Sequence, residues 1–319
     1  HDVSIVGTHL ENNSIEEINK KHFHQGLNLE VLRTIKFFKN ESINHIMKEK
    51  IDLIVLAINS KGIEWVSEEL KKISYKNTLP PLLMLTKGLS IYENKYELLV
   101  DKLIRLLTEK GIKNIILSAV GGPCLAAGLA NRVQSGVVIA NKNLDIANSL
   151  KKILTTNYYR ISTSVDINGV EVCAAIKNIF SMAIGAAPGL NKNKSKGNNH
   201  LNTSAALMRQ AIYEMELFVE FLNGKKETVN GLAGLGDLYV SSAGGRNSKM
   251  GGFIGEGMTF SEAKKNKMPN VTVEGAELIF EIGTKVKKDF DEKKLPLMIA
   301  MINAILEDKK LEIKWENFN

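Results

Sequence analysis

Residues 165–185 read VDINGVEVCAAIKNIFSMAIG, a stretch long enough for one buried helix. Between Val170 and Ile184 the apolar residues fall on nearly every side of a helical wheel, which is the pattern of a core helix. The polar residues of that span are Glu171, Lys177, Asn178 and Ser181. We therefore expect a helix that enters through a turn at Gly169 and lies inside the protein.

Lys177 is the unusual member of this helix, because a lysine in a buried helix is unfavourable unless another group pairs with it. Burial disfavours the charged ammonium and lowers its pKa toward the range in which the amine exchanges protons near neutral pH. Small neighbours at helical spacing, such as Cys173 and Ala174, let another segment or a ligand approach closely. The alternative is a lysine whose amine extends to the surface. The helix by itself does not separate these two interpretations.

Length and composition describe an ordinary globular chain with room for two domains. Its 319 residues are 44% apolar and 24% charged. The net charge of +7 suits a phosphorylated substrate or an acidic surface. Basic residues are scattered among acidic ones and aromatic residues make up 6%, which argues against nucleic acid as a partner. No apolar run approaches the ~18 residues that would indicate a membrane span.

The chain has two cysteines, Cys124 and Cys173. Both lie in apolar surroundings far apart in the sequence, which argues against a disulfide framework and suits a reducing compartment. No signal peptide is visible, although the first residue need not be the native start. We expect a cytoplasmic protein, and we assign no metal ligands.

The first half alternates short apolar strands with helical patterns. The expected strands are 3–7, 51–58, 82–86, 115–118, 136–140 and 159–162. The run at 51–58 is nearly continuous in apolar residues, like strands buried on both faces of a parallel sheet. Residues 93–110 are one of the helical patterns. This alternation predicts an α/β fold with a doubly wound, Rossmann-like parallel sheet, and a dinucleotide-binding domain over residues 1–163.

Two features follow strands at the edge where such sheets bind ligands. Lys87-Gly88 comes directly after the strand at 82–86, where a lysine can reach a crevice, although many loop lysines are merely solvated. Gly121-Gly122 follows the strand at 115–118, and glycines let a backbone come close to a ligand.

The second half is helical in pattern, and we expect an all-α substrate and catalytic domain over residues 164–319. Residues 191–199 are a polar, low-complexity loop. Thr259 and Glu262 have the spacing of a capping box at the start of a helix. Pro296 suits the first turn of a final helix.

A glycine-rich segment at 231–245 is followed directly by Arg246-Asn247. Backbone N–H groups of such a segment, together with a guanidinium fork, would suit a bound anion. A helix corner that needs glycine and happens to carry a surface arginine is an equally good interpretation of this segment alone.

Four motifs, in this order, resemble the signature of the NAD(P)-dependent glycerol-3-phosphate dehydrogenases. They are Thr86-Lys87-Gly88; Gly122-Pro123 with Ala126; the run from Thr163-Ser164 to Ile176-Lys177-Asn178; and Gly231 to Leu238 followed by Arg246-Asn247. Val273-Glu274-Gly275 and Leu295-Pro296 resemble two further elements of the family. The resemblance extends from Val3 to about Leu306, which makes it specific.

The resemblance implies a reversible hydride transfer between a nicotinamide cofactor, NAD or NADP, and sn-glycerol 3-phosphate, giving dihydroxyacetone phosphate and supplying glycerophospholipid synthesis. Lys177 would transfer the proton, Lys87 would stabilise charge on the C2 oxygen, and Asp237 would support Lys177. Arg246 and Asn247 would hold the phosphate. A homodimer is usual among relatives.

Further contacts follow from the same resemblance. Gly122 and Cys124 would touch the substrate. The cofactor contacts would be Thr8, Lys87, Ala126, Arg246, Thr272 and Glu274. Cys124 stands where relatives usually have Ser, Thr or Asn, so a hydrogen bond from that side chain would be weaker here.

One expected motif is absent. A dinucleotide-binding fold should open with a strand, the glycine loop G-x-G-x-x-G and a helix, and no such loop occurs in the sequence. The start at His1 resembles the family's second strand, so we expect a preceding unit of roughly 25 residues. Thr8 and His9 occupy the usual place of adenine-ribose contacts, and nothing acidic follows the strand directly, which leaves NAD or NADP open.

Two alternatives remain at this stage. Another β-hydroxyacid-type dehydrogenase would share the two-domain build but would not require the anion site at Arg246-Asn247. A non-catalytic nucleotide- or phosphate-binding relative could keep the fold without the glycine loop. Tests with non-phosphorylated substrates and cofactor titration separate these from the first hypothesis.

Overall fold

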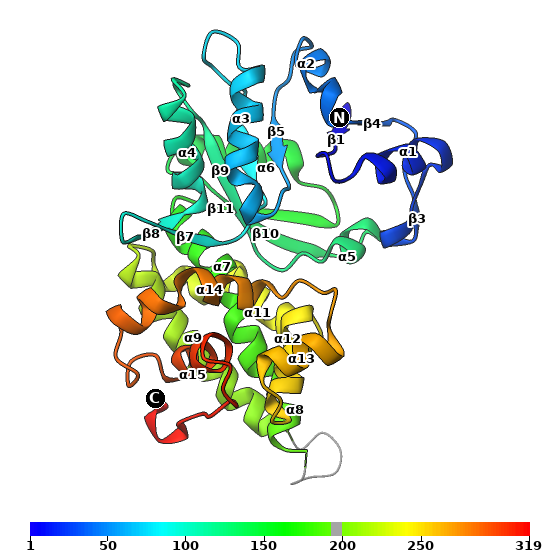
Figure 1. Cartoon of the computed structure of the whole chain (residues 1–319). Coiled ribbons are helices and arrows are strands. Elements are labelled where there is room, and N and C mark those ends of the chain that lie inside the picture. The colour runs from blue at the N-terminus through cyan, green and yellow to red at the C-terminus, as the bar shows by residue number, and fades with distance from the viewer. Residues whose placement is uncertain (193–199) are drawn as a thin grey trace.

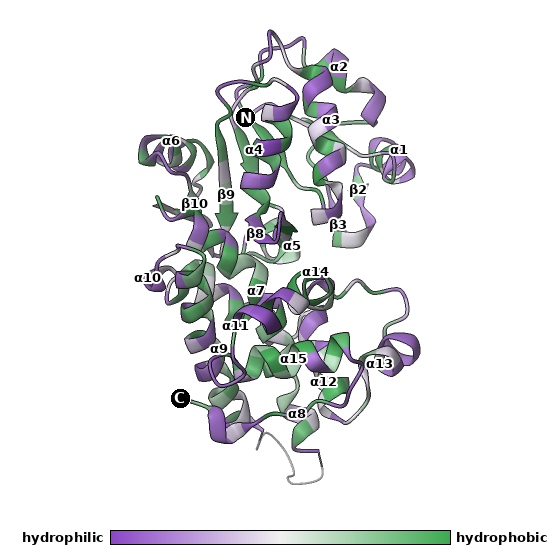
Figure 2. Cartoon of the chain, turned by 60° about the vertical axis from the view of Figure 1, so that its left-hand side comes forward, coloured by the Kyte–Doolittle hydropathy of each residue, from purple (hydrophilic) through white to green (hydrophobic). Residues whose placement is uncertain are grey.

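The computed structural model describes residues 1–192 and 200–319. It has two parts: a sheet with flanking helices, which contains the N-terminus, and a set of helices, which contains the C-terminus (Figure 1). Apolar residues colour most strands, while outer helices such as α6 (Leu144–Leu154) and α13 (Phe260–Lys267) carry hydrophilic residues on their outward faces (Figure 2). Most of the loop predicted at 191–199 lies outside the described residues.

The main sheet has five strands in the order β11-β10-β9-β6-β5. Their bounds are β5 Ile54–Leu56, β6 Leu82–Met84, β9 Leu117–Gly121, β10 Ser135–Ala140 and β11 Tyr159–Ser164. The sheet has a core on each face: Leu82 and Met84 pack toward α3 (Ile63–Ile73) and α4 (Leu99–Glu109), and Leu83 packs toward α6. Alternate residues of a strand point to opposite faces, so Leu83 faces the other side of the sheet from Leu82 and Met84. Helices therefore cover both faces, and the predicted doubly wound α/β fold is confirmed.

One pair of strands departs from the parallel sheet that we predicted. β10 runs antiparallel to β9, with Ile139 opposite Val120, whereas the other pairs of this sheet are parallel. The link between β9 and β10 contains only the five-residue helix α5 (Ala126–Ala130). Unlike the link with α6 between the parallel strands β10 and β11, this link has no long helix to cross the face of the sheet, and the chain turns back antiparallel to β9.

β1 (Val3–Val6) and β4 (Ile35–Phe38) form a separate parallel pair. In the part of the chain that the structure describes, β1 pairs only with β4, and β5 pairs only with β6. Val3, Ile5 and Val55 on these strands are exposed apolar residues. The expected strand and glycine loop before His1 stay a prediction.

The remaining elements of this part are short. Their bounds are α1 Asn12–Lys21, β2 Phe23–His24, β3 Leu29–Glu30, α2 Ile43–Ile46, β7 Leu89–Tyr92 and β8 Lys95–Leu98. The helix predicted at 93–110 begins only at Leu99, so the first six residues of that prediction were wrong. Glu93 and Asn94 have φ of 48° and 61°, and they form a two-residue turn between β7 and β8. Positive φ at both turn positions is the geometry that joins two antiparallel strands tightly.

The second part is built around α7 (Ile167–Gly185), the helix predicted from residues 165–185. The helices around it are α8 Ala187–Leu190, α9 Leu201–Phe221, α10 Lys226–Val229, α11 Asp237–Ser242, α12 Arg246–Gly255, α14 Glu274–Asp289 and α15 Pro296–Leu306. α7 is buried except at Asn168 and Asn178. A Cβ at Gly251 of α12 would lie 1.9 Å from the carbonyl oxygen of Met182, so glycine permits the close approach of α12 to α7.

By length and composition, Ile167–Leu190 could cross a membrane, which the sequence analysis did not anticipate. However, 94% of its most apolar window is buried inside the protein. It therefore has the environment of a core helix rather than of a helix that faces lipid.

Two predicted helix starts in this part are confirmed. Thr259 and Glu262 form the capping box at the start of α13, and Pro296 lies in the first turn of α15. α15 has no capping side chain from Leu295. Instead, the buried carboxylate of Glu214 in α9 accepts the N–H groups of Leu297 and Met298 at 2.7 Å each, which satisfies free donors at the helix start.

Candidate active site

Two lysine side chains from distant segments meet at one buried carboxylate, that of Asp237. Asp237, at the start of α11, accepts a hydrogen bond from Lys177 Nζ through Oδ1 and one from Lys87 Nζ through Oδ2, the latter at 2.8 Å. Lys177 lies in the middle of α7, and Lys87 lies in the loop between β6 and β7. The two lysines therefore share one anion at the junction of the sheet and the helices.

The environment of Lys177 decides between the two interpretations of the sequence. Its side chain is 8% exposed, so the amine does not reach the surface. Burial, and next the positive charge of Lys87, lower its pKa to about 8, while Asp237 acts in the opposite direction. An amine with this pKa can hold or release a proton near neutral pH.

Lys87 has a different setting although it shares the carboxylate. Its side chain is 31% exposed, whereas Asp237 is 4% exposed. The Lys87 amine is thus the solvent-facing member of the group. A charge at this position can approach a ligand at the carboxyl end of β6, the edge at which doubly wound sheets bind ligands.

Ser241 joins this group and was missed by the sequence analysis. Lys177 Nζ donates a hydrogen bond to Ser241 Oγ at 2.7 Å. Ser241 lies four residues after Asp237 in α11, so both side chains lie on the same face of that helix. The i, i+4 spacing was the available signal, because any helix that presents Asp237 to Lys177 presents Ser241 there too.

Gly234, three residues before Asp237, has a packing role in this structure. Residues Leu232–Gly236 form a widened helical turn directly before α11. A Cβ at Gly234 would lie 2.1 Å from the carbonyl oxygen of Val229, so no larger residue fits. This close packing sets where α11 begins and hence where Asp237 points.

Gly122 also has a packing role. Its φ is 125°, a conformation that favours glycine, and a Cβ there would lie 3.1 Å from Val137 Cα of β10. Close packing against β10 is thus one reason for a glycine at this position, and the expected contact of Gly122 with the substrate stays a prediction.

Arg246 and Asn247 begin α12 but have different surroundings. Arg246 is 56% exposed and forms an ion pair with Glu274. Asn247 is 6% exposed, accepts the N–H of Gly275 at 2.8 Å and donates to Asn178 Oδ1 at 3.1 Å. Arg246 is therefore open to a ligand, while the Asn247 amide already joins the start of α14 to the residue after Lys177. Asn178 was not among the predicted site residues.

The other predicted contacts lie around this junction or away from it. Burial raises the pKa of the Cys124 thiol while the nearby charge of Lys87 opposes the shift, which places Cys124 close to the group. Ala126 is the first residue of α5, and Thr272 is exposed just before α14. Thr8 follows β1 and donates its N–H and hydroxyl to Glu11. In the described ranges no hydrogen bond links Thr8, Ala126 or Thr272 to the Lys177 group.

Comparisons with known proteins show the family to which this chain is similar. A family model described as the N-terminus of NAD-dependent glycerol-3-phosphate dehydrogenase matches residues 1–147. The model of the C-terminus of the same enzyme matches residues 166–315. The two models together cover most of both parts of the molecule.

Individual relatives extend the match over nearly the whole chain. The NADP(+)-dependent glycerol-3-phosphate dehydrogenase of Archaeoglobus fulgidus is 27% identical over 320 residues, 98% of this chain and 90% of the relative. A glycerol-3-phosphate dehydrogenase of Fusobacterium nucleatum, named for NAD(P)+, is 33% identical over 269 residues, 83% and 75% of the two chains. The crystal structure of glycerol-3-phosphate dehydrogenase from Coxiella burnetii shares the fold, with a TM-score of 0.79 at 22% identity, covering 97% of this chain and 96% of that one. The chain belongs to the NAD-dependent glycerol-3-phosphate dehydrogenase family.

Proposed function

We propose that Lys177, Asp237 and Lys87 are the catalytic group with which this chain interconverts sn-glycerol 3-phosphate and dihydroxyacetone phosphate. The observation that carries the proposal is the single buried carboxylate that holds two lysines, one buried and one open. Residues 1–163 would hold the nucleotide, and residues 164–319 would supply the catalytic lysine and the phosphate site. The homodimer and the cytoplasmic location stay predictions.

The residues present fit the nicotinamide end of NAD or NADP. The Lys87 amine is partly open at the carboxyl end of β6, and the Arg246–Glu274 pair is exposed at the start of α12 and α14. Thr8, Lys87, Ala126, Arg246, Thr272 and Glu274 would contact the cofactor. When bound, the cofactor supplies or accepts the hydride at C2 of the substrate.

Lys177 would move the proton. In reduction its ammonium gives a proton to the C2 oxygen as the carbonyl becomes an alcohol, and in oxidation the neutral amine takes that proton back. Lys87 would stabilise negative charge that develops on the same oxygen. Asp237 would orient both amines, and Ser241 would fix the direction of the Lys177 amine by accepting one of its hydrogens.

The sign of the pH dependence follows from which form of Lys177 each direction needs. Burial sets the pKa of this amine at about 8. Reduction needs the ammonium, so its rate should fall as pH rises through about 8. Oxidation needs the neutral amine, so its rate should rise over the same interval.

Arg246 would hold the phosphate. Its guanidinium is exposed and is already paired with one carboxylate, so a phosphate dianion can compete for it as a bidentate partner. Asn247 would contribute mainly by fixing the start of α14, because its side chain is buried and hydrogen-bonded. Gly122 and Cys124 would border the bound substrate.

The assay that tests the function compares two substrates. Purified protein should oxidise NADH or NADPH in the presence of dihydroxyacetone phosphate, and much more slowly with unphosphorylated dihydroxyacetone. Absorbance at the nicotinamide band follows the reaction directly. Turnover of both substrates at similar kcat/KM would favour another β-hydroxyacid dehydrogenase, and no turnover of either, with no binding of dihydroxyacetone phosphate, would favour a non-catalytic relative.

Arg246→Ala should act mainly on substrate affinity, because a phosphate contact exists in the ground state and the transition state alike. A charge-assisted hydrogen bond of this type contributes about 1.5–3 kcal/mol, so KM for dihydroxyacetone phosphate should rise roughly tenfold to a hundredfold. Arg209→Ala is the matched control, since Arg209 is an exposed arginine of α9 that stacks on Tyr213. An unchanged KM in Arg246→Ala would place the phosphate site elsewhere.

A further inference from the structure

Glu171 is a buried acidic residue that the proposed chemistry does not use. It lies in α7, six residues before Lys177, and is 5% exposed. Its Oε1 accepts the N–H of Val100 at 3.3 Å, and its Oε2 is buried without a hydrogen-bond partner. The charged groups that face it are Asp101 in α4 and Lys142 after β10. A carboxyl group held in this way is costly to bury, so the contact with Val100 needs an explanation.

Val100 belongs to the first turn of α4, a helix that has no capping side chain of its own. The first N–H groups of a helix have no partner inside it, so an acceptor from another segment stabilises that end. Here the acceptor comes from α7. The hydrogen bond therefore ties the helix that carries Lys177 to the start of a helix that flanks the sheet.

The start of α4 also contacts the segment that carries Lys87. Leu99, the residue before Val100, is buried against Gly88, where a Cβ would lie 3.1 Å from the Leu99 side chain. Gly88 has φ of 153° and directly follows Lys87. A shift at the start of α4 is thus passed to the backbone next to Lys87.

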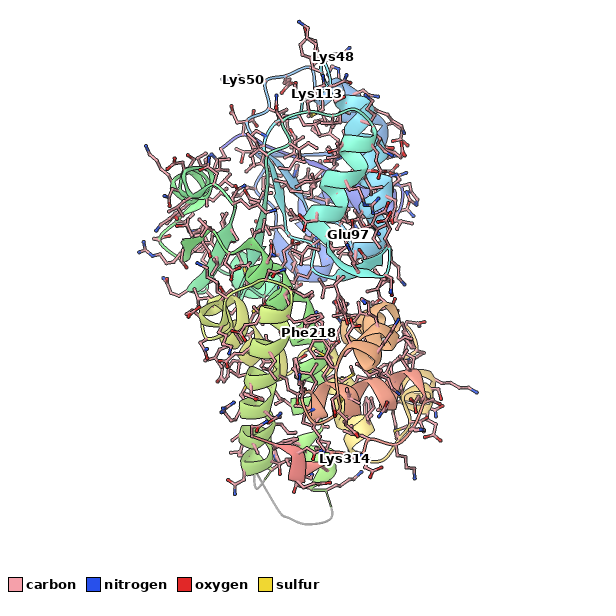
Figure 3. All side chains as sticks on the ribbon, turned by 90° about the vertical axis from the view of Figure 1, so that its left-hand side faces the viewer. Lys48, Lys50, Glu97, Lys113, Phe218 and Lys314 are labelled. Carbon is pink, nitrogen blue, oxygen red and sulfur yellow. The ribbon has the colours of Figure 1, made fainter. Side chains whose placement is uncertain are left out.

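The hairpin between these points is firmly joined to α4. Arg105 of α4 donates two hydrogen bonds to Glu97 of β8, at 2.8 and 3.0 Å, and its guanidinium lies 3.7 Å from the ring centre of Tyr92 in β7. Glu97 lies beside α4 at the edge of the sheet part that faces the helices (Figure 3). These contacts join β7, β8 and α4 to one another next to Gly88.

From these contacts we infer that Glu171 is a positioning residue for Lys87. By accepting the N–H of Val100, Glu171 fixes where α4 and the β7–β8 hairpin lie along α7. It thereby sets the distance between Lys87 and Lys177, which both bind Asp237. Glu171 and Lys177 are six residues apart, or about 9 Å along the helix axis, so α7 acts as the common support. This inference rests on the proposed function, in which Lys87 stabilises charge at the C2 oxygen.

Two substitutions with side chains of similar volume to that of Glu171 distinguish loss of the hydrogen-bond acceptor from loss of packing volume. Glu171→Gln keeps an oxygen that accepts the Val100 N–H, and burial raises the pKa of Glu171 to about 8, so the neutral amide is close to the form present at neutral pH. Glu171→Met fills the same space without an acceptor. Glu171→Met should lower kcat for dihydroxyacetone phosphate reduction about tenfold with KM nearly unchanged, since misplacement of a catalytic group acts on the transition state. Glu171→Gln should stay within about twofold of wild type.

A double-mutant cycle with Lys87→Ala shows whether the effect passes through Lys87. Lys87→Ala should lower kcat, and adding Glu171→Met to it should cause no further loss. Equal effects of Glu171→Met in both backgrounds, or a wild-type kcat in Glu171→Met while Lys87→Ala is impaired, would overturn the inference alone. A wild-type kcat in Lys87→Ala would instead overturn the role proposed for Lys87, and with it the inference. Circular dichroism of each variant checks that the compared proteins are folded.

Discussion

Lys177→Ala should lower kcat by about 10²–10⁴, the usual cost of losing a group that transfers a proton. The fold should survive, because Asp237 keeps Lys87 as its partner. KM for dihydroxyacetone phosphate should change little, since the phosphate would be held by Arg246. Steady-state rates in both directions measure this effect.

The pH profile identifies the lost group as the proton donor. In wild type the rate of reduction should fall as pH rises through about 8, the pKa of the buried Lys177 amine. In Lys177→Ala this descending limb should disappear. Lys285→Ala is the matched control, because Lys285 is also largely buried and paired with a carboxylate, Asp289, outside the site. A wild-type kcat in Lys177→Ala would remove Lys177 from the mechanism and make Lys87 the better candidate.

The sequence predicted the elements whose apolar pattern is continuous and missed those set by backbone conformation. Residues 165–185 form one nearly continuous buried helix, so the apolar pattern identified it over almost its full length. In the predicted strand at 51–58 only Ile54–Leu56 form β5, and Val55 is exposed. The turn at Glu93 and Asn94 has no glycine, and its positive φ values come from the pairing of β7 with β8. The helical spacing of the leucines from Leu98 onward therefore gave a predicted helix whose first residues, 93–98, belong to a hairpin.

For the site, too, the sequence indicated residues within single motifs but not the contacts between distant segments. The motifs indicated Lys177, Lys87 and Asp237, but no spacing could show that one carboxylate binds both lysines, because Lys87 and Asp237 are 150 positions apart. Ser241 was within reach of sequence reasoning, since it lies one helical turn after Asp237. Gly122 and Gly234 also pack closely against neighbouring backbone, a requirement that their motifs did not show.

Asp237→Asn should have the second large effect, because the carboxylate is the only anion that the structure places in hydrogen-bond contact with Lys177 among the described residues. An amide keeps the shape but removes the negative charge. Burial and Lys87 lower the pKa of Lys177, and Asp237 is the group that raises it. Without that opposition the pKa of Lys177 should fall below its wild-type value of about 8, and less of the amine is protonated at neutral pH.

The rate of reduction at pH 7 should then fall about 10²-fold, and the descending limb of the pH profile should move to lower pH. Partial recovery of the rate under more acidic conditions would follow, because the ammonium form returns there. Asp145→Asn, at an exposed carboxylate in the first turn of α6, controls for the loss of one negative charge. A limb that stays at the wild-type pH would show that Asp237 does not set the protonation of Lys177.

Stability should change with pH in a defined direction in Asp237→Asn. Removing one partner of a buried ion pair costs about 3–5 kcal/mol when the remaining charge is kept. Lys177 has a folded pKa below its unfolded value of 10.5, so the unfolded state binds more protons between the two values and stability rises with pH across that interval. In the variant, the pH interval over which stability rises should begin at lower pH, because the folded-state pKa of Lys177 is lower. The loss of stability relative to wild type should therefore be largest in acid and shrink as pH approaches about 8. Urea unfolding at several pH values measures the deficit, and a deficit that is the same at every pH would mean that the lost carboxylate is not coupled to the charge of Lys177.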